Sequence, residues 1–459
     1  MRIKTGIPID PARFGFAPNA SLSPVTGIAS DSGEILPGDL FLALPGKKTD
    51  GARYIPDAFA NGASCVLSHE AHPDPRILAV PDPLAVLTMV AGRYASTIHH
   101  TTVAVTGSYG KTTLRSALTS VLGSAFPVVS TEGNGNTDLA VALTLLSMAP
   151  GTRFLIAEIG MRGPGEISRL SRLVAPEVAA ITAIGSAHVG LLGSVDRIRA
   201  AKCEIADGMP SDGTLFYPAN DRLLGDAVSR LPVRACGVST DPRFPGAYAL
   251  SPTGYENGKP TVKLSGPETE LQSVTIPSFD VPTLSTAAFC FAVCAKLGVD
   301  PSVMRNGLAN LPTPPLRRQT ETVKSATVIL DCYNASPEPT AAALDELARY
   351  AGRRLILVLG DMLELGDDSE ELHRAVGRRA AELSPAWLLC VGREAHAYGV
   401  GACDAGLPRQ RIVSFAEDEM TTIASFLKRE MQPGDVLFIK GSRALALERL
   451  LPYLKEADV

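Results

Sequence analysis

Short runs of apolar residues recur along the chain, and each run ends in small or polar residues. Runs of this length, bounded by turn-forming residues, predict buried β-strands. The predicted strands span residues 103–105, 154–157, 178–184, 214–217, 327–330, 355–359, 387–391 and 436–439. Many stretches between these runs have the spacing of an amphipathic helix. The clearest apolar stripe consists of Leu114, Leu118, Val121 and Leu122.

The alternation of apolar strands with helical stretches indicates an α/β fold. Strands that are apolar along nearly their whole length favour parallel sheets that are covered by helices on both faces. In such sheets the binding sites lie beyond the carboxyl ends of the strands. The residues that directly follow each predicted strand are therefore the first candidates for a functional site.

The length of 459 residues predicts about three domains, since ~150 residues per domain is usual. Two breaks divide the chain. The first lies near His99 and His100, directly before a predicted strand. The second is the proline cluster at 311–316 (LPTPPL), which cannot continue a helix. The predicted domains are residues 1–99, 100–314 and 315–459.

Composition and charge exclude several classes of protein. The net charge is −5 with both signs interspersed, so no broad basic face for nucleic acid is expected. The eight cysteines form no CxxC pair, which is typical of reduced thiols in a cytoplasmic protein. The first 11 residues carry charges and prolines and do not resemble a signal peptide. No apolar run reaches ~18 residues, so no membrane span is expected.

The segment 103–113 reads VAVTGSYGKTT and predicts a phosphate-binding loop between a strand and a helix. Glycines allow backbone N–H groups to approach a phosphate, and the helix N-terminus adds its positive end. Lys111 is expected to reach the outer phosphates of a nucleotide, and the Thr112 hydroxyl to bind Mg²⁺. The predicted nucleotide-binding residues of this loop are Gly107, Ser108, Gly110, Lys111, Thr112 and Thr113.

Seven segments together resemble the Mur ligase family, in its order and at its spacing. They are TGSYGKTT at Thr106, AEIGMRGPGEI at Ala157, SAHVGLLGS at Ser186, AAKCEI at Ala200, DCYNASPEP at Asp331, GDMLELG at Gly360 and KGSR at Lys440. The segments GDMLELG and DCYNASP favour the family member that adds D-alanyl-D-alanine. The phosphate loop is two residues shorter than the common form, as is usual in this family.

The resemblance implies three domains: an N-terminal α/β domain that binds UDP-sugar, a central parallel-sheet ATPase domain and a C-terminal Rossmann-like domain. It implies an ATP-dependent acid–amino-acid ligase of peptidoglycan precursor synthesis. In the implied reaction, ATP phosphorylates the terminal carboxylate of UDP-N-acetylmuramoyl tripeptide, and the amine of D-alanyl-D-alanine attacks the resulting acyl phosphate. The expected partners are these two substrates, and the chain is expected to be a monomer.

The resemblance also implies a metal centre with two Mg²⁺ ions. Its ligands are Thr112, Glu158, His188 and Lys202, the last as a carbamate formed with CO₂. Lys111, His188 and Lys202 are the implied catalytic residues. Read singly, each residue favours an ordinary role: Glu158 as a solvated strand end, His188 as a hydrogen-bonded loop residue and Lys202 as a lysine of a helix surface.

Further implied roles concern the nucleotide and the two substrates. Asp331 is expected at the ATP ribose, Asn334 near the adenine and Arg317 at the phosphates, with Arg318 as the competing choice. For Lys440 and Arg443, a surface cation is the ordinary alternative. The implied substrate-binding residues are Lys440, Ser442 and Arg443 for the dipeptide, and Ser32, Asp50, Asn134 and Asn136 for the UDP-linked peptide.

Several positions depart from the family pattern, and three of them concern the nucleotide and UDP. Val281 and Ser285 stand where a histidine and an asparagine are usual, and Gly33 stands where an arginine is usual. These departures alter the expected contacts to the nucleotide and to UDP. They leave open another amide ligase of the superfamily, of folylpolyglutamate or cyanophycin type, or a non-catalytic nucleotide-binding paralogue. The sequence does not decide whether the third peptide residue is lysine or diaminopimelate.

Overall fold

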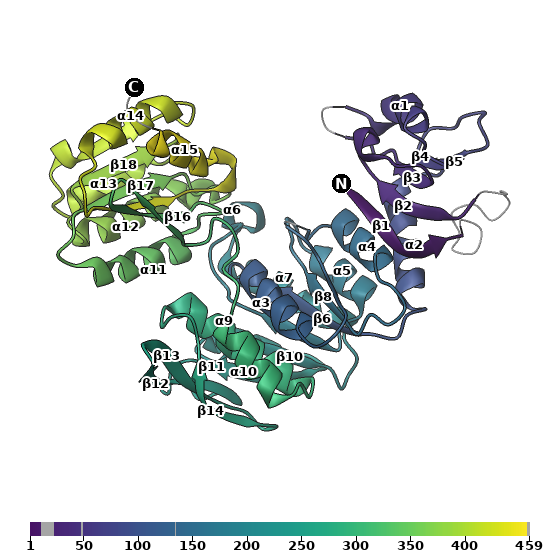
Figure 1. Ribbon diagram of the computed structural model, residues 1–459, viewed down its shortest axis with the longest axis horizontal. Coiled ribbons are helices and arrows are strands. Elements are labelled where there is room, and N and C mark those ends of the chain that lie inside the picture. The colour runs from purple at the N-terminus through teal and green to yellow at the C-terminus, as the bar shows by residue number, and fades with distance from the viewer. Residues whose placement is uncertain (11–22, 47–48, 134, 457–459) are drawn as a thin grey trace.

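The computed structural model describes residues 1–10, 23–46, 49–133 and 135–456. Three sheets follow one another along this chain, each covered by its own helices. In Figure 1 the N-terminal unit and the C-terminal unit lie on opposite sides of the central one. The α/β class with three mostly parallel sheets, predicted from the alternating pattern, is confirmed.

The N-terminal sheet has the strand order β1-β2-β3-β4-β5. Only β1 runs antiparallel to its neighbour, and the other pairs are parallel. Its elements are β1 (Arg2–Ile9), β2 (Val25–Ala29), β3 (Asp39–Leu42), α1 (Ile55–Ala60), β4 (Cys65–Ser68), β5 (Ile77–Ala79) and α2 (Pro83–Ala95).

The central sheet has nine strands in the order β14-β13-β12-β11-β10-β9-β6-β8-β7. Its first part holds β6 (Thr101–Thr106), α3 (Lys111–Gly123), β7 (Val128–Ser130), α4 (Asp138–Leu146), β8 (Phe154–Glu158), α5 (Glu166–Val174), β9 (Val178–Ile181), α6 (Val189–Leu192) and α7 (Val195–Cys203). Its second part holds β10 (Thr214–Pro218), α8 (Arg222–Val228), β11 (Arg234–Ser239), β12 (Tyr248–Glu256), β13 (Lys259–Ser265), β14 (Glu270–Thr275), α9 (Val281–Lys296) and α10 (Pro301–Ala309).

The C-terminal sheet has the order β15-β16-β20-β17-β18-β19, with β15 antiparallel to β16. Its strands are β15 (Gln319–Val323), β16 (Ala326–Asp331), β17 (Leu355–Gly360), β18 (Trp387–Val391), β19 (Ile412–Phe415) and β20 (Val436–Lys440). Its helices are α11 (Pro337–Leu347), α12 (Ser369–Glu382), α13 (His396–Asp404), α14 (Met420–Glu430) and α15 (Leu450–Lys455).

Each of the eight predicted strands is present, but one is shorter than predicted. The strand predicted over 178–184 ends at Ile181. Beyond it the chain turns toward the phosphate loop, where the Thr182 hydroxyl donates to the Thr106 carbonyl at 3.2 Å and the Ala183 carbonyl accepts from Ser108 N at 2.8 Å. The apolar stripe predicted on 114–122 is buried in α3, as its spacing indicates.

The central sheet has an antiparallel edge in addition to the parallel strands that the apolar runs predict. Strands β12, β13 and β14 pair antiparallel there. Asn257 and Gly258 connect β12 to β13, and both have positive φ, at 51° and 76°. This Asn-Gly pair is the strongest short-range signal for a two-residue hairpin.

No helix in the described part of the chain is long and apolar enough to cross a membrane. The domain bounds 1–99, 100–314 and 315–459 stay predictions.

Candidate active site

The phosphate loop joins β6 to α3, and β6 lies between β9 and β8 in the central sheet. Gly107 and Gly110 adopt φ values of 146° and 83°, which side chains rarely allow. A Cβ at Gly107 would collide with the Thr182 hydroxyl. Ser108 Oγ donates to the Gly185 carbonyl at 3.2 Å and accepts from Gly185 N at 3.0 Å. The predicted loop therefore has the narrow backbone cradle that a phosphate needs.

Lys111 lies folded back against this loop. Its Nζ donates to the Gly107 carbonyl at 2.7 Å. Burial lowers the pKa of Lys111, and the nearby Glu158 carboxylate partly offsets that effect. Arg317, from the opposite wall, lowers the pKa further. An incoming polyanion would stabilise the charged form of this lysine.

Glu158 ends β8 beside the phosphate loop and is buried, so the alternative of a solvated strand end is wrong. Its Oε1 accepts from the Thr112 hydroxyl at 3.2 Å and from Asn136 Nδ2 at 3.5 Å. Its Oε2 has no hydrogen-bond partner among the described residues, although Arg115 Nε lies 3.4 Å away. A buried carboxylate oxygen in this state is suited to bind a cation.

Lys202 lies on α7 and is 1% exposed, so the alternative of a lysine on a helix surface is wrong. Its Nζ has no hydrogen-bond partner in the described part of the chain. Burial and the neighbouring Lys111 hold the pKa of Lys202 well below its usual value, against the opposing effect of Glu158. Burial therefore favours the neutral form of the Lys202 amine.

His188 precedes α6 with a positive φ of 70°. Its Nδ1 is hydrogen-bonded to the Glu364 carboxylate, which comes from the C-terminal unit. Burial lowers the pKa of His188, while Glu364 raises it. Lys202 and Lys111 also lower this pKa, so the three side chains that were predicted to be catalytic share one electrostatic environment. The partner Glu364 was missed, although it lies in the segment GDMLELG.

These side chains face a cleft of about 1670 Å³ between the central and C-terminal units. The predicted residues that line it are Ser108, Gly110, Lys111, Thr112, Thr113, Asn136, Glu158, His188, Lys202, Arg317, Asp331, Asn334, Lys440, Ser442 and Arg443. Residues far apart in the chain thus meet at the carboxyl ends of two parallel sheets, as the fold predicts. Asn134 lies outside the described residues.

The C-terminal wall of the cleft contains a buried ion pair. Lys440 is 3% exposed, so the alternative of a surface cation is wrong for it. Its Nζ lies 2.8 Å from Asp331 Oδ2 and donates to the Asn334 carbonyl at 3.0 Å. Lys440 therefore holds together the two residues that were predicted to contact the nucleoside.

Arg317 and Arg318 differ in whether their guanidinium groups already have carboxylate partners. Arg318 pairs with Glu346 and lies 3.6 Å from Asp280 Oδ1. Arg317 stacks over the Tyr333 ring at 4.2 Å, and its buried Nε has no hydrogen-bond partner in the described chain. Arg317 is the better candidate for binding phosphate, since its cation lacks a carboxylate partner within the described residues.

Two further cleft residues already have partners. Ser442 Oγ accepts from Leu363 N at 3.1 Å, and Arg443 forms an ion pair with Glu448. Val281, at the start of α9, is 63% exposed and lines the cleft. An apolar side chain there offers no hydrogen bond to a ligand.

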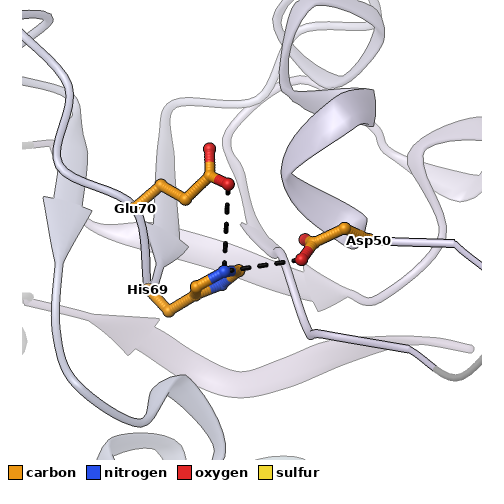
Figure 2. Close-up of side chains that lie close together, drawn as sticks. All are labelled: Asp50, His69 and Glu70. Carbon is orange, nitrogen blue, oxygen red and sulfur yellow. Dashed lines mark ion pairs between the residues drawn. The ribbon is translucent and has the colours of Figure 1, made fainter.

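The two candidates in the N-terminal unit lie away from this cleft. Ser32 is half-buried in a short 3₁₀ helix, and Asp50 caps another by accepting from Ala52 N at 2.9 Å. Figure 2 shows His69 facing Asp50 and Glu70, with Nε2–oxygen distances of 3.4 and 3.9 Å. His69 was missed because it follows β4, far from Asp50 in sequence. This cluster is polar and partly exposed, as a surface for a charged ligand requires.

Comparison with known proteins places three family matches along the chain. They are the Mur ligase family, catalytic domain, at 24–90, the Mur ligase middle domain at 105–264, and the Mur ligase, glutamate ligase domain, at 317–443.

Similar curated proteins bear one name, UDP-N-acetylmuramoyl-tripeptide–D-alanyl-D-alanine ligase. The Bacillus subtilis protein is 31% identical over 448 residues, which cover 95% of this chain and 94% of that protein. The Escherichia coli protein is 30% identical over 446 residues, covering 94% and 93%.

Solved structures agree. The MurF ligase of Thermotoga maritima in complex with ADP superposes with a TM-score of 0.81 at 28% identity, covering 93% of this chain and 96% of that one. MurF from Acinetobacter baumannii gives 0.83 at 27% identity, covering 98% and 100%. The folylpolyglutamate synthase of Mycobacterium tuberculosis gives 0.60 at 15% identity, covering 82% and 94%, which indicates a shared fold alone.

Proposed function

The chain belongs to the Mur ligase family, and we propose that it is the ATP-dependent ligase that joins D-alanyl-D-alanine to UDP-N-acetylmuramoyl tripeptide. This reaction is a step of peptidoglycan precursor synthesis. The observation that carries the proposal is the similarity of the whole chain to ligases of that name, over 95% of its length. The folylpolyglutamate alternative is less well supported, because the structural similarity to that enzyme is lower.

The reaction proceeds in two steps. First, a carboxylate oxygen of the tripeptide forms a bond to the γ-phosphorus of ATP, and the bond to ADP breaks. The dipeptide amine then forms a bond to the acyl carbon, phosphate leaves, and the amine loses a proton. The phosphate loop binds the nucleotide, and Lys111 stabilises the negative charge of the transferred group.

The residues at the end of β8 fit a metal ion. Two observations support this: the Oε2 atom of Glu158 and the Nζ atom of Lys202 are buried without hydrogen bonds in the described chain. Thr112, Glu158, His188 and a modified Lys202 would hold two Mg²⁺ ions. Bound Mg²⁺ supplies positive charge that offsets the repulsion between a carboxylate and a triphosphate.

Lys202 is suited to carbamylation. Its neutral amine forms a bond to the carbon of CO₂ and releases a proton, which leaves a carboxylate-like group. The low pKa that burial imposes on Lys202 favours the neutral amine that this step needs. The product carries negative charge beside Lys111, where an ammonium would be repelled.

The C-terminal wall would complete the site. Asp331 and Asn334 contact the nucleoside, and Arg317 the phosphates. Lys440, Ser442 and Arg443 lie at the same wall as candidates for the dipeptide carboxylate. Ser32, Asp50 and Asn136 remain candidates for the UDP-linked peptide.

One chain supplies both walls of the cleft, which supports action as a monomer. All eight cysteines are free, which supports a cytoplasmic location.

The test is phosphate release with ATP, Mg²⁺, UDP-N-acetylmuramoyl tripeptide and D-alanyl-D-alanine, omitting each in turn, with the product mass measured in parallel. Tripeptides that contain lysine and tripeptides that contain diaminopimelate are both assayed. We expect turnover only when ATP, Mg²⁺, the UDP-linked tripeptide and D-alanyl-D-alanine are all present. Equal turnover with a glutamate or folate substrate contradicts the proposal, as does ATP binding without turnover.

A further inference from the structure

One short segment of the central unit, residues 185–190, reaches across the cleft and contacts the C-terminal unit. It follows β9 and leads into α6, which lies against the C-terminal unit in Figure 1. Its contacts come from two segments, DCYNASPEP and GDMLELG, which the sequence analysis singled out without assigning a role to their glutamates. Three stretches distant in sequence therefore converge beside the phosphate loop.

The first contact is made by Glu338, in the first turn of α11. Its Oε1 accepts from Ser186 N at 2.9 Å, and its Oε2 accepts from the Ser186 hydroxyl at 3.2 Å. A Cβ at Gly185 would lie 3.0 Å from Glu338 Oε2 and 3.1 Å from the Tyr109 ring, so the carboxylate lies directly against the phosphate loop. Two charge-assisted hydrogen bonds of this kind fix both distance and orientation.

The second contact is made by Glu364, whose φ is 66°. Its carboxylate binds His188 Nδ1, and its carbonyl accepts from Gly190 N at 3.1 Å. A Cβ at Gly190 would overlap the backbone of Gly366. The two backbone segments therefore lie so close together that only glycine fits at position 190. Val189 packs against the core of the C-terminal unit.

The loop that carries Glu364 is braced within its own unit. Asp361, which begins this loop, accepts from the backbone N–H groups of Arg393, Glu394 and Ala395. Met362 N donates to His373 Nε2 at 3.0 Å, and Leu363 N donates to Ser442 Oγ at 3.1 Å. These hydrogen bonds to three other segments tie the loop, and Glu364 with it, to the rest of the C-terminal unit.

We propose that Glu338 and Glu364 are positioning residues that latch the C-terminal unit onto the segment 185–190 when the cleft closes. A carboxylate that accepts a hydrogen bond from Nδ1–H leaves Nε2 of His188 as the free ligand atom and fixes the orientation of the ring. Closure of the C-terminal wall is thereby coupled to the orientation of His188. The inference rests on the proposed function, since that function gives closure its purpose of excluding water from an acyl phosphate.

The Glu338 arm is tested by a double-mutant cycle with Glu338→Ala and Ser186→Ala. Each single variant should lower kcat more than it changes the KM for ATP, and should raise the ratio of phosphate released to amide formed. The double variant should lose less than the product of the single losses, by about fivefold, because both substitutions remove the bond between the Ser186 hydroxyl and Glu338 Oε2, while Glu338→Ala also removes the bond to Ser186 N. If the losses in kcat of the two single variants simply multiply in the double variant, the proposed role of the contact between Glu338 and Ser186 is wrong. Glu371→Ala, an exposed carboxylate paired with Arg378, is the matched control.

The Glu364 arm is tested without the peptide substrates, by Mn²⁺ binding to the ADP complex measured by electron paramagnetic resonance. Glu364→Ala should weaken Mn²⁺ binding by about tenfold or more. Glu364→Gln, which keeps an acceptor oxygen, should recover part of the loss.

Small-angle scattering should show Glu338→Ala and Glu364→Ala to be more extended than the wild type with ADP bound. Folded variants with unchanged Mn²⁺ affinity and unchanged scattering would overturn the latch. Failure of the proposed function appears instead as absent turnover in the wild-type protein.

Discussion

Two lysines are buried in the walls of the cleft, and they differ in what surrounds them. Lys202 on the central wall is 1% exposed, and Lys440 on the C-terminal wall is 3% exposed. Lys440 meets the Asp331 carboxylate at 2.8 Å and the Asn334 carbonyl at 3.0 Å. The Lys202 amine meets no hydrogen-bond partner in the described chain, and its pKa lies well below the usual value.

The comparison teaches that equal burial can serve opposite purposes. A buried ammonium costs several kcal/mol unless a partner offsets its lost hydration. Lys440 has that partner and acts as a strut between strand ends β16 and β20, where Asp331 and Lys440 are paired in register. Lys202 has no such partner in the described chain, and its burial lowers its pKa, which favours the neutral amine that the proposed reaction with CO₂ needs.

The largest effect is expected for Lys202→Ala, which should lower kcat by about 10³-fold, the scale for removing a preorganised electrostatic group. A small carboxylic acid such as acetate should restore part of the activity, by occupying the space of the carbamate. Lys202→Arg should stay inactive, since a guanidinium remains charged and does not form the carbamate. Steady-state phosphate release checks all three. Near-normal activity of a folded Lys202→Ala variant would contradict a role of Lys202 in catalysis.

A smaller effect, on stability as well as activity, is expected for Lys440→Met. Breaking the buried pair leaves the Asp331 carboxylate unmatched, and should lower the free energy of unfolding by about 3 kcal/mol. The KM for ATP should also rise, because Asp331 and Asn334 lose their common anchor. Urea denaturation and initial rates provide the two measurements. A variant with unchanged stability would show that Lys440 is not a strut.

On the free energy of unfolding, Lys202→Met should have the smallest effect of these variants, and one of the opposite sign to that of Lys440→Met. In CO₂-free buffer it should raise the free energy of unfolding by about 1 kcal/mol or more, because it removes an unsatisfied buried amine. The pKa of Lys202 is lower in the folded state than in the unfolded state, where it is about 10.4. Between these two pKa values the unfolded chain binds more protons than the folded one, so the stability of the wild-type protein rises with pH. The difference in the free energy of unfolding between Lys202→Met and the wild type should therefore become smaller from pH 7 to 9.5. A difference that is constant over this range would contradict the depressed pKa.

The parts of the site that could be predicted are those encoded by adjacent residues. The loop 107–113 and the strand that precedes it depend on glycine conformations and on one apolar run, and the structure has both. Glu158 and His188 could be placed near the site because the carboxyl ends of parallel strands meet there.

The parts that could not be predicted depend on the packing of distant segments. The burial of Lys202 is invisible in α7, whose sequence favours a surface lysine when read alone. The partners Glu338 and Glu364 lie more than 150 residues from Ser186 and His188. Only the relative placement of two units brings these residues together. The antiparallel edge of the central sheet, which was not predicted, is different. Asn257 and Gly258 are a local sequence signal for the hairpin between β12 and β13.

The contrast between the two lysines is tested most directly by ¹³C NMR of protein equilibrated with ¹³C-labelled bicarbonate. The wild-type protein should show one carbamate resonance, and Lys440→Met should keep it in the folded state. The resonance should disappear in Lys202→Ala. A carbamate signal that persists in Lys202→Ala, or its absence from an active wild-type enzyme, would contradict the assignment of Lys202 as the reactive lysine of the cleft.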